Sequence, residues 1–280
     1  MSYPNAAISF PGLFGDWRFT LPPKLFDIGN GVYWYGVIIA SGILLALLFC
    51  SKQAKKYGLT EDDIYDTALW AIPFAIVGAR LYYVVFYLDI YRRADGSLDF
   101  PAMVRIWDGG LAIYGGIIAG GITVFDICRF KKIKILKVAD AAAPAVMIGQ
   151  FLGRWGNFFN GEAYGSAVSS DSLLYFMRMG LSFGEGSEKK NYYHPTFLYE
   201  SLWNAAGFAA LHFLSKIRRY DGQIALGYVA WYGLGRTMIE GLRTDSLYWG
   251  AFRVSQLLAA ISCLAAAAVL LILAMKQHDP

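Results

Sequence analysis

Gly153-Arg154-Trp155-Gly156-Asn157-Phe158-Phe159-Asn160-Gly161-Glu162-Ala163-Tyr164-Gly165 directly follows an apolar run, residues 138–152, yet it holds an arginine, two asparagines and a glutamate. An arginine at bilayer depth costs at least a few kcal/mol unless it faces a partner or a wet cavity. On a helix, Gln150, Arg154 and Asn157 line one face, because they are spaced i, i+4 and i+7. We therefore expect the polar face of this segment to point inward, and its glycines to let the chain leave the helix.

The composition is that of an integral membrane protein. Of the 280 residues, 56% are hydrophobic and 16% are charged, whereas soluble domains are about 25% charged. The net charge of +4 is too small to suggest nucleic acid as a partner. The cysteines, Cys50, Cys128 and Cys263, are too widely spaced for a disulfide framework or a metal site, which leaves them as small buried hydrophobes.

Seven apolar segments predict an all-α membrane protein with seven transmembrane helices, each near the ~20 residues that cross ~30 Å of hydrocarbon. The third segment contains Gly116-x-x-x-Gly120, which allows a neighbouring helix to approach closely. We expect a single membrane domain, residues 1–280, with segment 160–194 as a small extracytoplasmic cap between the fourth and fifth helices. The segments are residues 32–50, 67–88, 111–125, 138–159, 196–214, 223–239 and 252–275.

Basic side chains gather in alternate loops, and they predict the orientation of the chain. Because short cytoplasmic loops carry an excess of lysine and arginine, these loops are expected to be cytoplasmic. The N-terminus then lies outside and the C-terminus inside. The basic residues after the first, third and fifth helices are Lys52, Lys55, Lys56, Arg129, Lys131, Lys132, Lys134, Lys137, Lys216, Arg218 and Arg219.

Three arginines on different predicted helices are expected at one depth. At ~1.5 Å per residue, Arg154 lies ~25 Å, Arg236 ~22 Å and Arg80 ~21 Å from the cytoplasmic ends of their helices. Tyr114 and Tyr35 are expected in the same outer half of the membrane. Cations this close at low dielectric need an anion between them. Because the guanidinium fork binds phosphate through two hydrogen bonds, the sequence predicts a site for a lipid phosphate.

The sixth predicted helix repeats the inward polar face. Its stripe is spaced i, i+4, i+8 and i+11, and within it Arg236 and Glu240 can form an ion pair. The stripe consists of Tyr232, Arg236, Glu240 and Arg243, and further negative charge comes from Glu162 and Glu200.

Each candidate also has a purely structural interpretation. Arg80 could order the bundle through an ion pair, and the glutamates could serve only as counter-ions. Tyr35 and Tyr114 could be packing aromatics, and His194 could fix the loop before the fifth helix. Asn157 and Asn160 could only cap the end of the fourth helix.

No protein nucleophile is evident in the sequence. It contains neither a Gly-x-Ser-x-Gly elbow nor a His-Glu-x-x-His zinc pair. If the chain is an enzyme, the nucleophile therefore belongs to a substrate, and the protein binds, orients and polarises.

With these residues in hand, the chain resembles the prolipoprotein diacylglyceryl transferase family over about residues 30–275. The stretch from Gly153 to Gly165 is similar to the family signature, and the form Gly110-Leu-Ala-Ile-Tyr114 is similar to Gram-positive members. Some relatives carry a histidine at the position of Tyr114, so a histidine base cannot be assumed for this chain. Further matches are Asp140, Gly78-Ala79-Arg80-Leu81, Trp107-Asp108-Gly109-Gly110-Leu111, His194-Pro195-x-x-x-Tyr199-Glu200 and Gly235-Arg236-x-x-x-Glu240-x-x-Arg243-x-Asp245.

The resemblance implies a reaction in the bacterial cytoplasmic membrane, at a site toward the outer leaflet. Phosphatidylglycerol would give its diacylglyceryl group to the lipobox cysteine of a preprolipoprotein signal peptide, forming a thioether and releasing glycerol phosphate, with no metal, cofactor or nucleic acid. The residues expected in catalysis are Arg154, Arg236, Tyr114 and Glu240. Those expected to bind phosphatidylglycerol are Arg154, Arg236, Tyr35, Asn157, Asn160, Gly165 and Arg80. Those expected to support the site are Asp140, Glu162, His194, Tyr199, Glu200, Tyr232 and Arg243.

Two other classes of function use the same arginine cluster. A lipid or anion transporter would need a polar route to the cytoplasmic side, and the cytoplasmic halves of the second, fourth and sixth helices are apolar. A non-catalytic assembly factor would show no turnover when purified.

Overall fold

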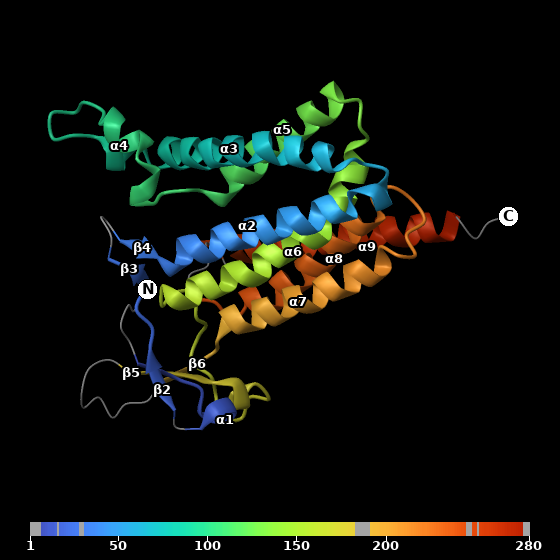
Figure 1. The fold of residues 1–280 in the computed structure, drawn as a ribbon. Helices are drawn as coiled ribbons and strands as arrows, with labels where there is room; N and C mark the ends of the chain where they lie inside the picture. The colour runs from blue at the N-terminus through green and yellow to red at the C-terminus, as the bar shows by residue number, and fades with distance from the viewer. Residues whose placement is uncertain are drawn as a thin grey trace. The chain divides into compact units, whose positions relative to one another are not determined.

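A computed structural model describes residues 7–15, 17–27, 31–182, 191–244, 248–250 and 252–276. The chain divides into two compact units (Figure 1). Unit 1 consists of Met1–Phe49 and Asp140–Pro280, and unit 2 consists of Cys50–Ala139. The expectation of a single membrane domain with an inserted cap at 160–194 stays a prediction. Residues 183–190 of this segment, and Asp245 at the end of the family motif, lie outside the described residues.

Every apolar segment predicted from the sequence corresponds to a long helix. The boundaries agree to within six residues, and the fifth segment coincides with its helix at both ends. The long helices are α2 (Trp34–Gln53), α3 (Glu61–Phe86), α5 (Ile113–Phe130), α6 (Ile135–Phe159), α7 (Thr196–Leu214), α8 (Gln223–Glu240) and α9 (Val254–Lys276). The short ones are α1 (Pro11–Phe14), α4 (Phe100–Val104), η1 (Ala54–Tyr57), η2 (Leu88–Tyr91), η3 (Ile106–Asp108) and η4 (Tyr175–Met177).

Five helices in the described part of the chain are long and apolar enough to cross a membrane, which marks a membrane protein. They are Trp34–Tyr57, Glu61–Phe86, Ile113–Phe130, Ile135–Phe159 and Val254–Lys276. Helices α7 and α8 have the length of a span, but their polar stripes lower their hydropathy. The coarser statement, a mostly helical membrane protein, therefore holds, and the count of seven stays a prediction.

The largest shift of a boundary is at the start of α3, six residues before the predicted Thr67. Thr60 caps the helix: its hydroxyl accepts from the Asp63 amide at 3.1 Å, and the Asp63 carboxylate accepts from the Thr60 amide at 3.0 Å. Acidic residues in a first turn also interact favourably with the helix dipole. These polar residues begin the helix without adding to its apolar run.

Unit 2 is built on the pair α3 and α5, which approach closely through glycines. A side chain at Gly78 would lie 2.7 Å from the Gly115 carbonyl oxygen, and a side chain at Gly120 would lie 3.3 Å from Ala75. The close approach predicted from Gly116-x-x-x-Gly120 is thus confirmed, with α3 as the neighbour.

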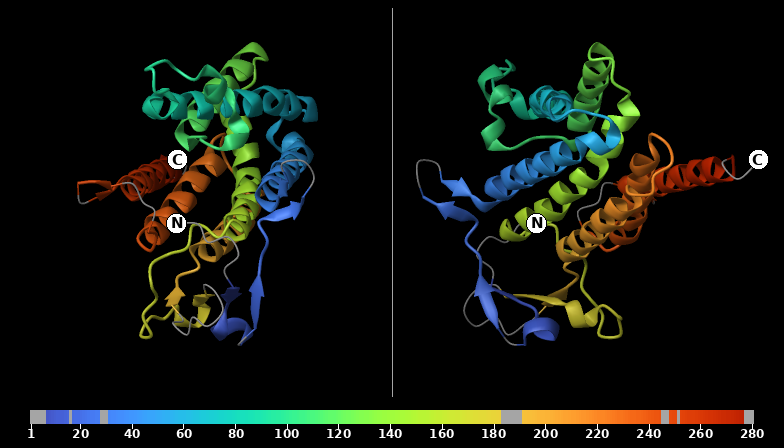
Figure 2. Two further views of the ribbon diagram at one scale, coloured as in Figure 1. Left: turned by 90° about the vertical axis from the view of Figure 1, so that its left-hand side faces the viewer. Right: turned by 45° about the vertical axis from the view of Figure 1, so that its right-hand side comes forward.

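In unit 1, helices α2, α6, α7, α8 and α9 run side by side (Figures 1 and 2). Trp203 of α7 and Trp231 of α8 stack at 4.7 Å, and each indole nitrogen donates to the other residue's carbonyl at 3.0 Å. Each ring packs on a glycine of the opposite helix, Gly235 and Gly207, where a methyl group would collide with it. Two helices that bear charged residues are thereby held at a fixed spacing.

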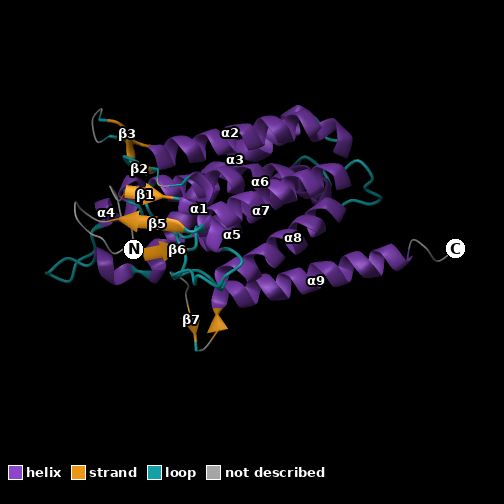
Figure 3. Ribbon diagram, turned by 90° about the horizontal axis from the view of Figure 1, so that it is seen from below, coloured by secondary structure: helices purple, strands orange, loops and turns teal. Residues whose placement is uncertain are grey.

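A four-stranded antiparallel sheet of unit 1, in the order β2-β1-β5-β6, was not predicted from the sequence. It lies beyond the end of α6 and the start of α7 (Figure 3). Strand β1 pairs with its neighbour in sequence and also with residues about 170 positions later, as in Ile8 opposite Leu181. The strands are β1 (Ala7–Ser9), β2 (Arg18–Thr20), β5 (Met179–Ser182) and β6 (Asn191–Tyr193); two-stranded ribbons form from β3 (Lys24–Phe26) with β4 (Val32–Tyr33) and β7 (Tyr248–Trp249) with β8 (Phe252–Arg253).

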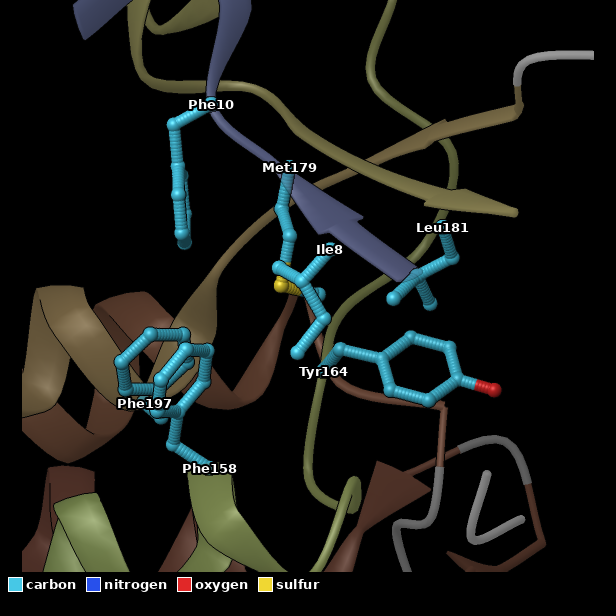
Figure 4. Packing of buried hydrophobic residues seen from close by; sticks show 7 residues of the cluster. All are labelled: Ile8, Phe10, Phe158, Tyr164, Met179, Leu181 and Phe197. Atoms are coloured by element: carbon cyan, nitrogen blue, oxygen red, sulfur yellow. The ribbon is translucent and has the colours of Figure 1, made fainter. Parts of the chain in front are cut away.

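An apolar cluster attaches this sheet to the ends of α6 and α7 (Figure 4). The rings of Phe158 on α6 and Phe197 on α7 stack with 4.5 Å between their centroids. Burial of such side chains typically contributes about 1.5–3 kcal/mol each. The cluster therefore anchors the helix ends on either side of segment 160–194. Its buried members are Ile8, Phe10, Phe158, Tyr164, Met179, Leu181 and Phe197.

Candidate active site

Three arginines of unit 1 converge on one carboxylate. Glu200 lies in the second turn of α7, and its side chain is only 3% exposed. Nη2 of Arg154 lies 2.5 Å from Oε2 of Glu200, while Nη1 of Arg236 and Nη1 of Arg243 lie 3.1 Å and 3.0 Å from Oε1. Arg154 and Arg236 come from α6 and α8, so three helices meet at this point.

A second carboxylate completes what we call the arginine cluster: Arg154, Arg236, Arg243, Glu200 and Glu240. Oε2 of Glu240 lies 2.7 Å from Nη2 of Arg236, one turn earlier on α8. Three guanidinium groups against two carboxylates leave one net positive charge. Such a buried arrangement depends on each charge keeping its partners.

The positive groups of the cluster are more accessible than the negative ones. The side chains of Arg154 and Arg236 are 19% and 17% exposed, whereas those of Glu200 and Glu240 are 3% and 2% exposed. The carboxylates therefore lie behind the guanidinium groups and hold them in place. What the cluster offers to an incoming molecule is two adjacent guanidinium groups, which is the arrangement that binds a phosphate.

Hydrogen bonds between side chains near the cluster hold α6 against α7 and α8. Trp155 Nε1 donates to Ser201 Oγ at 3.0 Å, and Ser201 in turn donates to the Phe151 carbonyl at 3.2 Å, which ties α6 to α7. Gln150 Nε2 donates to the Tyr228 hydroxyl at 2.8 Å, which ties α6 to α8. Tyr232 stacks on Tyr228 at 5.8 Å and continues this contact along α8.

Arg243 is held by the backbone of the segment that follows α6. Gly165 forms a bridge with Arg243, its amide donates to the His194 carbonyl at 2.7 Å, and the next amide donates to the Leu242 carbonyl at 2.7 Å. A Cβ at Gly165 would lie 2.8 Å from the His194 Cβ and from the Leu242 oxygen. Only glycine lets these three segments approach so closely.

The two asparagines predicted to bind substrate contact a glutamate, and their binding role stays a prediction. The side-chain amides of Asn157 and Asn160 donate to Oε1 of Glu162 at 3.0 Å and 3.3 Å. Tyr35 of α2 lies against Gly156, where a Cβ would be 2.9 Å from its ring. Its hydroxyl interacts electrostatically with both Glu162 and Arg154, so these residues border the arginine cluster.

His194 is a buried residue beside the start of α7. Its Nδ1 lies 3.2 Å from the Tyr199 hydroxyl. Burial lowers the pKa of His194 below its ordinary value of 6.5, because the charged imidazolium is poorly solvated there. At neutral pH the ring is therefore uncharged and adds nothing to the net charge of the arginine cluster.

Arg80 and Tyr114 belong to unit 2, and their membership of the same site stays a prediction. Arg80 is 7% exposed. Its guanidinium donates to four backbone carbonyls at 2.5–2.9 Å, and these bonds organise the loop before α5. Tyr114 is the second residue of α5 and is 41% exposed. The carbonyls bound to Arg80 are those of Ala102, Met103, Gly109 and Gly110.

Sequence reasoning ranked Glu200 as a supporting residue and missed Arg253. Arg253 donates to the carbonyl oxygen of Glu240, at the end of α8. Nothing in the local pattern identifies Glu200 as the common partner of three arginines, because these arginines come from distant parts of the chain. Within the described ranges, no group of three or more His, Cys, Asp or Glu side chains is placed to hold a metal ion.

Comparison with known proteins gives one consistent result. A family model described as prolipoprotein diacylglyceryl transferase matches residues 23–272. A phosphatidylglycerol–prolipoprotein diacylglyceryl transferase of Listeria monocytogenes serotype 4b is 42% identical over 261 residues, which are 93% of this chain and 92% of that protein. Proteins of the same name from Lysinibacillus sphaericus and Limosilactobacillus reuteri are 43% and 42% identical, covering 85% and 88% of this chain and 87% and 88% of their own.

Proposed function

This chain belongs to the prolipoprotein diacylglyceryl transferase family, and we propose that its reaction takes place at the arginine cluster around Glu200. The chain is a transferase: it moves the diacylglyceryl group of phosphatidylglycerol to prolipoprotein, the first step of lipoprotein maturation. One observation supports this choice of site: the accessible guanidinium groups of Arg154 and Arg236 both contact the same buried carboxylate, that of Glu200.

Arg154 and Arg236 clamp the phosphate of phosphatidylglycerol. Both side chains are partly accessible, and each has donors beyond those that contact Glu200. In the partly dry surroundings of the cluster, these donors stabilise the negative charge that grows on the departing phosphate. Tyr35, Asn157, Asn160 and Gly165 border the clamp and shape the space for the headgroup, while Arg80 acts through the loop that it organises.

The substrate cysteine supplies the nucleophile. Its sulfur attacks the glycerol carbon that carries the phosphate ester; the C–S bond forms as the C–O bond breaks, and glycerol phosphate leaves with the electron pair. The net positive charge of the cluster favours the thiolate over the thiol. The thiol proton passes to a carboxylate, for which Glu240 is the candidate, while Tyr114 is the candidate hydroxyl that orients the thiol; no metal or cofactor takes part.

The membrane arrangement follows from the helices and from the basic loops. We place α7 and α8 in the membrane as the fifth and sixth of seven spans, beside the five apolar helices, because their polar stripes face other helices rather than lipid. The N-terminus then lies outside and the C-terminus in the cytoplasm. Segment 160–194 forms the extracytoplasmic cap, the arginine cluster lies toward the outer leaflet of the bacterial cell membrane, and the signal peptide enters from the membrane.

The test is turnover by purified protein. A lipobox peptide is incubated with the protein and phosphatidylglycerol, and the thioether product is measured by mass spectrometry. Arg154→Ala and Arg236→Ala should each lower the rate of product formation by at least about 10²–10³-fold while the folded protein is recovered in normal amount. Full turnover by either variant would exclude the cluster as the reaction site.

A further inference from the structure

Asp140 of α6 is a buried carboxylate far from the arginine cluster. It is 0% exposed, and both of its oxygens accept hydrogen bonds from backbone amides of another helix. Oδ2 accepts from Gly222 at 2.8 Å, and Oδ1 accepts from Ile224 and Ala225 at 2.9 Å. Arg218 pairs with Oδ2 at 3.1 Å and balances the charge.

The amides that bind Asp140 belong to the first turn of α8, which lacks a cap of its own. The N-cap residue of α8 is Gly222, at φ +94°, and it has no side chain to accept these bonds. The first amides of a helix have no partner within the helix. Asp140 therefore performs from α6 the task that an N-cap side chain performs locally, and in doing so it joins the two helices.

The joined ends lie at equal distances from the two clamp arginines. Arg154 is fourteen residues after Asp140, and Arg236 is fourteen residues after Gly222. At 1.5 Å per residue, each arginine is about 21 Å, or about four turns, beyond the contact between Asp140 and the start of α8. Four turns return a side chain to nearly the same face of its helix. Helices joined at Asp140 thus bring both arginines to one level, where both contact Glu200.

We propose that Asp140 is a positioning residue that sets the axial register of α8 against α6, so that Arg154 and Arg236 reach the phosphate together. The inference rests on the proposed site, since it concerns the same two arginines. A carboxylate bound by three amides and a guanidinium leaves little freedom for sliding. One hydrogen bond, from Gln150 to Tyr228, also joins α6 to α8 between Asp140 and the arginine cluster. A single neutral hydrogen bond is too weak to replace the contacts of Asp140.

The test is a double-mutant cycle on kcat/KM for phosphatidylglycerol, with each rate divided by the amount of folded protein. Asp140→Asn is combined with Arg236→Gln, and Asp140→Glu serves as a second variant that keeps the charge but lengthens the arm. The matched control is Asp221→Asn, which removes the other carboxylate paired with Arg218, at 3.0 Å, and leaves the amides of α8 bound.

Asp140→Asn and Asp140→Glu should each lower kcat/KM by roughly a hundredfold, because misplacement of about 1 Å has effects of that order. In the Arg236→Gln background, the further loss from Asp140→Asn should be less than about threefold, because register no longer matters when one arginine is absent. Asp221→Asn should stay close to the wild type.

Two outcomes overturn the proposal. One is wild-type kcat/KM in the folded Asp140 variants. The other is the same hundredfold loss in both backgrounds, which would mean that Asp140 acts independently of the clamp. Failure of the proposed site looks different, because Arg236→Gln alone would then keep full activity. If Asp140→Asn does not fold, the decision rests on Asp140→Glu in the same two backgrounds.

Discussion

The guanidinium groups of Arg154 and Arg236 contact the same carboxylate group, at 2.5 Å from Oε2 and 3.1 Å from Oε1 of Glu200. Two like charges this close would repel strongly at low dielectric without that carboxylate. The arrangement keeps two cations side by side before any lipid binds. In the proposed mechanism the enzyme therefore does not have to bring these two arginines together during the reaction, which is the condition for effective electrostatic catalysis.

Replacement of either clamp arginine by lysine should lower kcat by about 10²–10³-fold, although the charge is kept. A lysine ammonium cannot contact Glu200 and a phosphate through one planar fork. The measurement is single-turnover formation of the thioether on a lipobox peptide, with Arg154→Lys and Arg236→Lys purified in phosphatidylglycerol-containing micelles.

The matched control for these variants is Arg92→Lys. Arg92 pairs with Asp89 at 3.1 Å in an exposed loop, and its side chain is 52% exposed. Such surface pairs contribute little to stability, so this variant should keep the wild-type rate. If Arg154→Lys and Arg236→Lys also keep that rate, a positive charge at each position is sufficient for activity. The proposal of a bidentate contact between each arginine and the phosphate is then wrong.

Glu200→Gln should destabilise the protein more than any substitution at an exposed glutamate. It leaves three guanidinium groups around a neutral amide, and removal of one partner from a buried ion pair typically costs about 3–5 kcal/mol. We expect the Tm to fall by several degrees. Glu61→Gln, at an exposed site in the first turn of α3, is the control and should change the Tm little.

An anion should rescue Glu200→Gln if the cluster binds phosphate. Glycerol phosphate at millimolar concentration should raise the Tm of this variant more than that of the wild type, since it replaces the missing negative charge. Glycerol at the same concentration should have no such effect. Equal shifts for both proteins would place the anion elsewhere.

The sequence was sufficient for the helices because each depends on a local pattern. Hydrophobic runs of about 20 residues predicted all the long helices, and α7 was placed at the correct residues. The sheet was missed for the opposite reason. Strands β1 and β5 have three and four residues and meet over about 170 positions of chain, so neither shows a period long enough to recognise.

The arginine cluster was predictable only in part. The pair of Arg236 with Glu240 follows from helix spacing, because the residues are four apart. The convergence on Glu200 does not, because it depends on how α6, α7 and α8 pack. Asp140 was noticed through a family resemblance, and its bonds to the start of α8 could not be foreseen from positions 82–85 residues away.

Arg80→Lys separates a structural role from lipid binding. A lysine cannot reach the four carbonyls bound by the guanidinium, so the loop before α5 should loosen and the Tm should fall. KM for phosphatidylglycerol should stay unchanged in the protein that remains folded. Arg105→Lys, in the same loop, is the control. A normal Tm with a raised KM would instead support direct contact between Arg80 and the lipid.

His194 should make stability depend on pH below about 6.5. Burial lowers its pKa in the folded state, so the unfolded chain binds a proton more readily. Its contribution is fully present above the unfolded pKa of about 6.5 and is lost as the pH falls toward the folded pKa. The wild type should therefore lose more Tm between about pH 7.5 and about pH 5 than His194→Asn does. Parallel Tm curves for the two proteins would show that His194 does not contribute.

Gly165→Ala should separate the segment after α6 from its two neighbours. The added methyl group would lie 2.8 Å from the His194 Cβ, 2.8 Å from the Leu242 oxygen and 2.9 Å from Thr196 Cγ2, and the backbone oxygen cannot move aside without breaking the bridge to Arg243. We expect a lower Tm and a loss of activity, since overpacking of this kind typically costs about 1–3 kcal/mol. The control is Gly149→Ala on α6, where a Cβ meets no atom within 4 Å and alanine favours the helix. If both variants keep the wild-type Tm and rate, the added methyl group fits beside His194 and Leu242. In that case Gly165 is not what positions Arg243.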